Sequence, residues 1–227
     1  MSRPLIIGHR GASAIAPENT LAAFEAAIAA GADGVEFDVR LASDGVPIVI
    51  HDDTLYRTAG VRHHVAGLSA NQLNQYDVPS LAQVFELFQS NELLLCLEMK
   101  GQTLQLVEAC CRLIEQHRLR DRLVLSCFEQ SALEAARSID RTLRIAALFQ
   151  SPFAFIVERA IAIGASEIAL HHRLVDERLV QKARLAGLEV VVWTVDDPTW
   201  VKRAQDIGLH ALITNNPSAL IHARNAI

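Results

Sequence analysis

Short apolar runs that are typical of β-strands alternate along this chain with segments that are typical of amphipathic helices. The runs are nearly continuous in Val, Ile and Leu, as expected for strands buried on both faces. Strict alternation of strands and helices predicts a parallel sheet, either closed into a barrel or open and doubly wound. The nine candidate strands are residues 5–8, 34–40, 46–52, 93–99, 122–128, 144–149, 167–172, 189–195 and 211–214.

One of these runs is surplus to a (β/α)₈ barrel, and the pair Asp44-Gly45 explains it. An Asp-Gly pair between two strand runs is typical of a two-residue β-hairpin. The run 46–52 should therefore turn back antiparallel on the run 34–40. Eight βα units then remain, and the sequence favours an α/β fold of the TIM-barrel type with a hairpin after the second strand.

The same hairpin predicts a cluster of polar side chains. A two-residue turn at Asp44-Gly45 places Asp38 opposite His51, and directly opposed residues point to the same side of a sheet. Glu36 shares that side because strand side chains alternate with period two. Two carboxylates and an imidazole are thus expected in one small region.

Residues 53–79 form the longest connection without a strong periodic pattern. Long connections in compact domains are often active-site covers, so we expect a small insertion above the barrel mouth, with at most one short helix around residues 70–75. The chain has 227 residues, of which 51% are hydrophobic. These values suit a single domain over residues 1–227 with a large core.

Charge and composition exclude several classes of partner. The net charge of −5 and the pI of about 6.0 argue against nucleic acid and anionic lipid. Apolar runs fall short of the roughly 20 residues of a membrane span, and the N-terminal residues resemble neither a signal peptide nor a transit peptide. The four cysteines form no CxxC pair and are interpreted as core thiols. We expect a cytoplasmic protein of undetermined oligomeric state.

Polar side chains gather where the predicted strands end. Charged residues should be scarce inside barrel strands, because burying an unpaired charge is costly. The C-terminal ends of the strands form the active site in barrels of this kind. The residues at these ends are His9, Arg10, Glu36, Asp38, Arg40, His51, Glu98, Lys100 and Trp193.

The three carboxylates of this group supply only oxygen donors. Glu36, Asp38 and Glu98 therefore suit a hard divalent cation, Mg²⁺ or Ca²⁺ with Mn²⁺ also open, rather than structural zinc. The alternative is a buried ion network with the neighbouring arginines and lysine. The residues alone favour the two interpretations about equally.

Two histidines near such a cluster suggest a proton donor and a proton acceptor, because imidazole titrates near neutral pH. A lone histidine at a strand end more often makes only a structural hydrogen bond, but the pairing of His9 with His51 favours a catalytic role. Arg10 and Lys100 would complete a phosphate pocket, the first by bidentate contacts and the second as a point charge.

Five segments together resemble the glycerophosphodiester phosphodiesterases, in the family's order and over nearly the whole chain. They are HRGASAIAPENT, GADGVEFDVRLASDGVPIVIHDDTLYRT, VPSL, LEMKG and VVVWTVDDP. By position, the resemblance implies an acid/base pair, His9 and His51; three metal ligands, Glu36, Asp38 and Glu98; two phosphate contacts, Arg10 and Lys100; and a wall of the site, Trp193.

The resemblance implies hydrolysis of glycerophosphodiesters, such as glycerophosphocholine or glycerophosphoethanolamine, to sn-glycerol 3-phosphate and an alcohol. The chain departs from the family at Asn215, where an aspartate is common. Which histidine is the acid, and whether a glycerol hydroxyl or water attacks, stay open. The alternatives are a lysophospholipase D-like or phosphoinositide-type phosphodiesterase, or a non-catalytic phosphate-binding barrel.

Overall fold

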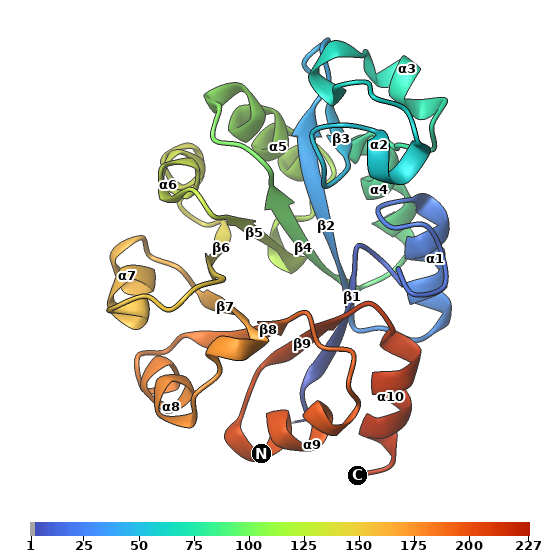
Figure 1. The fold of residues 1–227 in the computed structure, drawn as a ribbon. Coiled ribbons are helices and arrows are strands. Elements are labelled where there is room, and N and C mark those ends of the chain that lie inside the picture. Colours follow the sequence, from blue (N-terminus) through green and yellow to red (C-terminus); the bar gives the residue numbers. More distant parts are fainter. Residues whose placement is uncertain (1–2) are drawn as a thin grey trace.

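All nine predicted runs contain a strand in the computed structural model, which describes residues 3–227. The strand order is β1-β9-β8-β7-β6-β5-β4-β2-β3, and a further pairing of β1 with β2 closes the barrel (Figure 1). The TIM barrel is thus confirmed, with β3 as the additional strand. The parallel barrel strands are β1 (Leu5–His9), β2 (Gly34–Leu41), β4 (Leu94–Met99), β5 (Leu123–Cys127), β6 (Arg144–Phe149), β7 (Glu167–His171), β8 (Glu189–Trp193) and β9 (Ala211–Thr214).

Helices surround the strands in an outer layer (Figure 1). A capping box formed by Ser80 and Gln83 opens the fourth helix, where each side chain accepts a hydrogen bond from the other residue's backbone amide. The helices of the outer layer are α1 (Leu21–Ala29), α4 (Leu81–Leu87), α5 (Leu104–Gln116), α6 (Gln130–Ile139), α7 (Ile156–Ala162), α8 (Glu177–Leu185), α9 (Thr199–Ile207) and α10 (Pro217–Asn225).

The core lies mainly between the barrel and this outer layer. Phe37 of β2 packs edge-on against Phe24 of α1 and Phe85 of α4, with ring centroids 5.8 and 6.4 Å apart. All three rings are completely buried. None of the helices described within residues 3–227 is long and apolar enough to cross a membrane.

The hairpin strand β3 (Pro47–Val49) runs antiparallel to β2, as predicted, but its register differs by one residue. The amide of Ile50 donates to the carbonyl of Asp38 over 2.9 Å. The predicted pairing of Asp38 with His51 is therefore wrong.

The shift arises at the turn, which contains three residues instead of two. The amide of Ala42 donates to the carbonyl of Val46 over 3.0 Å, which leaves residues 43–45 as the loop. Gly45 has a φ of +77°. This left-handed conformation closes three-residue hairpin loops.

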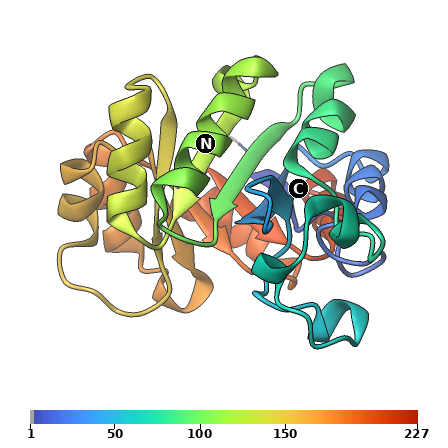
Figure 2. The same ribbon diagram turned by 90° about the horizontal axis from the view of Figure 1, so that it is seen from above.

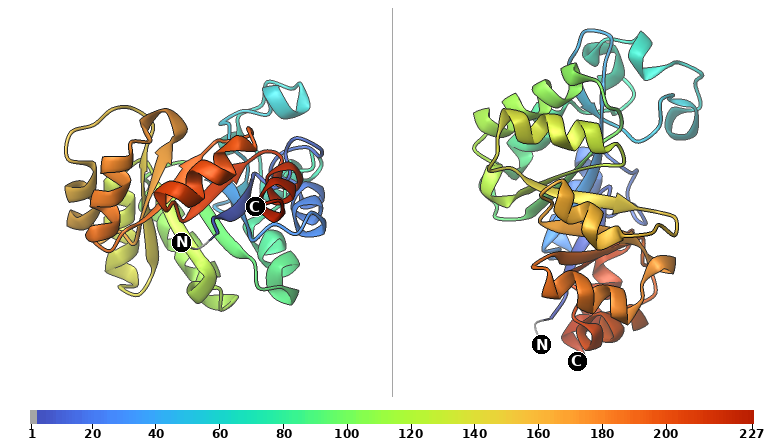
Figure 3. Two further views of the ribbon diagram at one scale, coloured as in Figure 1. Left: turned by 90° about the horizontal axis from the view of Figure 1, so that it is seen from below. Right: turned by 90° about the vertical axis from the view of Figure 1, so that its left-hand side faces the viewer.

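The insertion at residues 53–79 projects from one edge of the molecule (Figures 2 and 3). It contains two helices, α2 (Tyr56–Ala59) and α3 (Ala70–Asn74), so the expectation of at most one short helix is wrong. Leu55, Val65 and Leu73 give it a small core of its own against β3. Short 3₁₀ turns occur at Val65–Gly67, Phe88–Ser90, Arg120–Arg122 and His172–Leu174.

Candidate active site

The strand registers bring the predicted polar residues to one level of the barrel. His9 of β1 pairs with Glu36 of β2, and Asp38 of β2 pairs with Glu98 of β4. The residues that alternate with the carboxylates along β2, such as Phe37, belong to the core under the helices. Because side chains alternate across a strand, both β2 carboxylates face the barrel interior.

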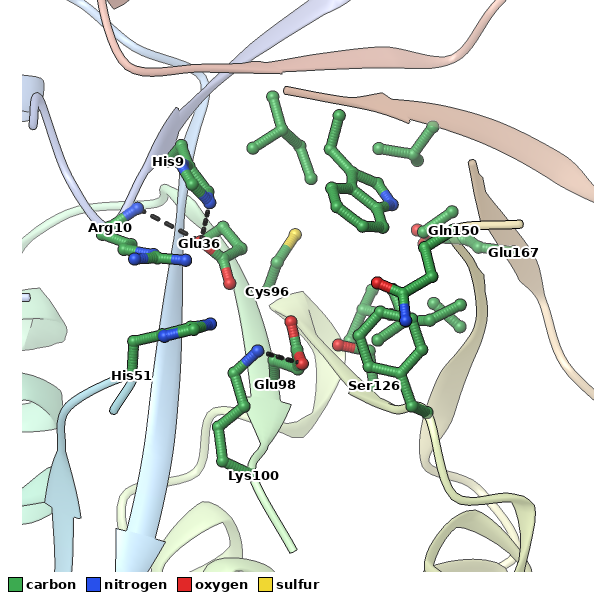
Figure 4. Close-up of a pocket in the computed structure, with 18 residues that line it drawn as sticks. His9, Arg10, Glu36, His51, Cys96, Glu98, Lys100, Ser126, Gln150 and Glu167 are labelled. Atoms are coloured by element: carbon green, nitrogen blue, oxygen red, sulfur yellow. Dashed lines mark hydrogen bonds and ion pairs between the residues drawn. The ribbon is translucent and has the colours of Figure 1, made fainter. Parts of the chain in front are cut away.

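A pocket of about 130 Å³ lies at the C-terminal ends of the strands (Figure 4). Asp38 is 1% exposed and does not line the pocket. Within residues 3–227, no residue of the insertion lines the pocket, so the expected cover over the mouth is not seen. The predicted site residues that line it are His9, Arg10, Glu36, His51, Glu98, Lys100 and Trp193.

Asp38 is the carboxylate with the most partners. Its Oδ1 lies 3.1 Å from Lys100 Nζ, and its Oδ2 lies 3.1 Å from Arg10 Nε. The side-chain Nδ2 of Asn19 donates to Asp38 Oδ2 over 2.8 Å. Burial alone would raise the pKa of Asp38, but Lys100 and Arg10 hold it below its usual value.

Glu36 and Glu98 are less well compensated. Burial, followed by repulsion from Asp38 and Glu98, raises the pKa of Glu36 well above its usual value. Burial and Asp38 also raise the pKa of Glu98, although Lys100 Nζ contacts its Oε1. The cluster therefore has three carboxylates and two cationic side chains, and the excess negative charge is concentrated at the two glutamates.

This arrangement fits a divalent metal ion. One oxygen from each of Glu36, Asp38 and Glu98 lies within 4.8 Å of the others. All the donors are oxygens, as hard cations prefer, and a cation would relieve the repulsion that raises the glutamate pKa values. The structure is therefore compatible with both interpretations of the sequence, the ion network and the metal site. The carboxylates pair with Arg10 and Lys100, and they could also hold a metal.

Arg40 does not belong to this cluster. Its Nε donates to the carbonyl of His51 over 2.7 Å, and its Nη1 donates to the carbonyl of Lys100 over 3.3 Å. Arg40 therefore links the backbone at His51 to the backbone at Lys100. The ion-network interpretation had expected it to pair with a carboxylate, and no such pair is present within residues 3–227.

His9 is held by a chain of hydrogen bonds that determines which ring nitrogen carries the proton. Asn215 Nδ2 donates to Asp196 Oδ2 over 2.7 Å. The carboxylate can only accept, so Asn215 Oδ1 faces His9 Nδ1, at 2.7 Å. Nδ1 of His9 must then be the donor, and Nε2, 3.8 Å from Glu36, is the nitrogen that can accept a proton. Burial and the charge of Arg10 lower the pKa of His9.

His51 is held by a carboxylate instead of an amide. Its Nδ1 lies 2.7 Å from Asp52 Oδ1. Strand pairing stops before His51, so the alternation along β3 does not fix its direction, and the ring points into the pocket (Figure 4). Burial lowers the pKa of His51, while Asp38 and Asp52 act in the opposite direction.

Two aromatic side chains, Trp193 and Phe128, line the pocket together with aliphatic residues of β5 to β9. Trp193 packs edge-on against Phe128 and against His171, with centroids 6.1 and 5.3 Å apart. Its Nε1 is buried and has no hydrogen-bond partner within residues 3–227, so it is free to donate to a ligand. Gln150 adds an amide to the pocket lining.

Comparison with known proteins decides the family. The model described as "Glycerophosphoryl diester phosphodiesterase family" matches residues 9–219. The chain belongs to this family.

Other members of the family align with this chain over nearly its whole length. A glycerophosphodiester phosphodiesterase of Caldanaerobacter subterraneus is 29% identical, with 97% of each chain covered. The solved structure of an Oleispira antarctica phosphodiesterase in complex with the product sn-glycerol-3-phosphate is 27% identical, with a TM-score of 0.91 and coverage of 98% of this chain and 97% of that one. A lysophospholipase D of Mus musculus is 28% identical over 94% of this chain and 84% of its own.

Several residues of this phosphodiesterase site were not predicted. The departure at Asn215 was noted without a role, and Asp196 was not considered. Phe128, Gln150, Ser126 and Cys96 line the pocket, so Cys96 is not simply a core thiol. The alternation of β4 gives the signal for Cys96, because it lies two residues before Glu98 and therefore on the same face.

Proposed function

We propose that this chain hydrolyses glycerophosphodiesters to sn-glycerol 3-phosphate and an alcohol, with a divalent metal bound at Glu36, Asp38 and Glu98. The observation that carries the proposal is one pocket lined by two carboxylates of the cluster, Glu36 and Glu98, and by two imidazoles. Each imidazole is bonded through Nδ1 to an acceptor that does not line the pocket. The product bound by the Oleispira antarctica relative supports the substrate class.

The metal we propose is Mg²⁺, with Ca²⁺ and Mn²⁺ as the other candidates of matching ligand chemistry. When bound, such an ion withdraws negative charge from phosphoryl oxygens. Arg10 and Lys100 both contact Asp38 and both line the pocket. Their charges would stabilise the negative charge that develops on the phosphoryl group in the transition state.

We propose that His9 is the base and His51 the acid. Neutral His9 presents an unprotonated Nε2 to the pocket, because its Nδ1 donates to the neutral amide of Asn215. A carboxylate partner stabilises a protonated ring more than an amide does, and His51 has Asp52. His51 would therefore hold the proton that the leaving alkoxide needs, while His9 would take one from the attacking hydroxyl of glycerol or water.

A second candidate, lysophospholipid hydrolysis, is favoured by one feature of the mouth. Phe153 and Phe155, in the loop between β6 and α7, are 54% and 71% exposed, and Phe128 at the pocket wall is 40% exposed. Exposed aromatic side chains beside a pocket suit the acyl chain of a single-chain lipid. The similarity to the Mus musculus lysophospholipase D points the same way.

A substrate panel tests the proposal. The purified protein would be assayed with Mg²⁺, Ca²⁺ and Mn²⁺ on glycerophosphocholine, glycerophosphoethanolamine and lysophosphatidylcholine. We expect sn-glycerol 3-phosphate to be released from the first two. Release of choline from the third in preference would support the second candidate, and no turnover of any would contradict the proposal in favour of a non-catalytic phosphate-binding barrel.

Two further properties belong to the same proposal. We place the protein in the cytoplasm, because its four cysteines are free thiols, the state that a reducing compartment maintains. We also treat residues 1–227 as one phosphodiesterase domain, which the family match over residues 9–219 supports.

A further inference from the structure

Arg57 lies in the insertion, on α2, and outside the pocket, yet all three of its guanidinium nitrogens are used. Nε donates to Asp52 Oδ2 over 2.7 Å. Nη1 and Nη2 donate to the two oxygens of Glu18 over 2.6 and 2.7 Å. Arg57 thus makes a bidentate, charge-assisted contact with Glu18 and a separate one with Asp52. Bidentate contacts of this kind fix geometry as well as charge.

Each of these acceptors also holds a residue of the pocket. Asp52 Oδ1 lies 2.7 Å from His51 Nδ1. Glu18 Oε1 accepts from Arg10 Nη1 over 2.8 Å. Arg57 is therefore one carboxylate away from a proposed catalytic imidazole and one carboxylate away from a proposed phosphate contact.

We propose that Arg57 is a positioning residue, which orients His51 through Asp52 and Arg10 through Glu18. We call Glu18, Asp52 and Arg57 the Arg57 bridge. The inference rests on the proposed function, since it gives the insertion a role in that reaction. The insertion would act by holding two walls of the pocket in place, rather than by covering the mouth.

The exposure of the bridge argues that its role is geometric. The Arg57 side chain is 46% exposed, and those of Glu18 and Asp52 are 20% and 26% exposed. Ion pairs at such exposure add little to stability. Their effect on the residues that they orient can be larger. Outer partners of metal ligands typically change activity by about 10- to 100-fold when they are replaced, and we expect an effect of similar size for the partners of His51 and Arg10.

The bridge also keeps Asp52 available as an acceptor. The hydrogen bond from Arg57 is the largest cause that lowers the pKa of Asp52 to about 2. Asp52 is therefore ionised, and His51 Nδ1 must be the donor in their contact. Without Arg57, one oxygen of Asp52 would lose its partner, and the carboxylate would be free to turn away from the ring.

The test compares Arg57→Gln with Arg62→Gln, a matched control. Arg62 belongs to the same insertion, is exposed, and lies over the Tyr56 ring at 5.5 Å instead of contacting the bridge. Both variants lose one positive charge from the same segment. We expect Arg57→Gln to lower kcat/KM by about 10- to 100-fold on glycerophosphocholine, and Arg62→Gln to leave it unchanged, with equal Tm for both.

Two more variants separate the contribution of Asp52 from that of Glu18. Asp52→Asn should lower kcat with little change in KM, because it disturbs proton transfer, and Glu18→Gln should raise KM, because it loosens the phosphate contact. Combining Arg57→Gln with Asp52→Asn should lower kcat no further than the worse single variant, since both act through one contact. Independent, multiplying losses would overturn the inference, as would equal activity of Arg57→Gln and Arg62→Gln.

NMR of the His51 ring provides a readout that does not need turnover. Nitrogen shifts should show Nδ1–H in the wild type and in Arg62→Gln, and a changed Nδ1 environment in Arg57→Gln. An inactive wild type would contradict the proposed function, and the ring signals would still show whether Arg57 orients His51. An unchanged His51 signal in Arg57→Gln would overturn the inference itself.

Discussion

The barrel has carboxylates with cationic partners at both ends, and the two ends balance them differently. At the floor, where the strands begin, Arg144 Nη2 donates to Glu167 over 2.7 Å and to Glu189 over 3.0 Å, and His210 lies 3.3 Å from Glu189. Glu167 is buried and also lines the pocket, whereas the Glu189 side chain is 41% exposed. At the mouth, three carboxylates share two cations beside two imidazoles that face a pocket.

The comparison shows that ion pairs at one end of a barrel do not by themselves mark a site. At the floor one arginine joins the carboxylates, and the arrangement is that of a structural ion network. At the mouth the donors exceed what the cations neutralise, and the histidines point their free nitrogens inward. The arginine, the glutamates and the histidine of the floor provide control variants for the tests of the mouth.

The largest expected effect is that of metal removal. Chelation should abolish turnover, and Mg²⁺ or a similar ion should restore it, because Glu36, Asp38 and Glu98 have no other cation sufficient to balance them. Glu36→Gln should raise the metal concentration for half activity at least about tenfold, whereas Glu189→Gln, at the floor and outside the pocket lining, should leave it unchanged. Full activity after exhaustive chelation would contradict a metal role for the carboxylates of the mouth, which would then be an ion network like that of the floor.

Loss of either mouth histidine should have the next largest effect. His9→Ala and His51→Ala should each lower kcat by about 10²–10⁴-fold, as expected for a positioned acid or base. His210→Ala, which removes the histidine of the floor, should change kcat little. Steady-state kinetics of the three variants at saturating metal makes this comparison.

A better leaving group assigns the two roles. p-Nitrophenolate needs little protonation, so a p-nitrophenyl phosphodiester should rescue His51→Ala, which lacks the proposed acid, and not His9→Ala. The reverse pattern would exchange the roles. Rescue of both variants or of neither would show that the histidines do not divide the proton transfers.

The cations of the two ends should differ in what they support. Lys100→Ala would remove the contact to the transition state that we propose for this lysine, and such a contact is worth about 2.7–4 kcal/mol, or roughly 10²–10³-fold in kcat. Arg144→Gln should lower the free energy of unfolding and leave kcat nearly unchanged. A loss below about threefold for Lys100→Ala would place this lysine in a structural network like that of Arg144.

Features that depend on local alternation could be predicted from the sequence. Glu36 and Asp38 are two residues apart in an apolar strand, so their common face follows from period two whatever the partner strand is. The register of the hairpin could not be predicted in this way. Asp44-Gly45 is compatible with a loop of two or three residues, and the hydrogen bond between Ala42 and Val46 decides between them.

Contacts between distant segments lay beyond the sequence patterns. His9 and Asn215 are 206 residues apart, and Arg57 and Glu18 are 39 residues apart. No periodicity relates such positions, because the closure of the barrel and the fold of the insertion bring them together. The positions of the candidate site residues on the strands were therefore predictable, and the residues that hold their side chains were not.

The smallest expected effect on activity is that of the floor carboxylate, which should instead be visible in stability. Burial raises the pKa of Glu167 to about 7, although Arg144 acts in the opposite direction, whereas an unfolded chain has a glutamate pKa of about 4.3. Between these values the folded protein keeps a proton that the unfolded chain has released. The stability that this group contributes is therefore complete below about pH 4.3 and is lost as the pH rises to about 7, by on the order of 3 kcal/mol. Glu167→Gln has no such proton, so the unfolding free energy of the wild type relative to the variant should fall between about pH 5 and about pH 8. Urea unfolding of both proteins at these pH values measures the difference, and parallel pH profiles would show that Arg144 keeps Glu167 ionised throughout.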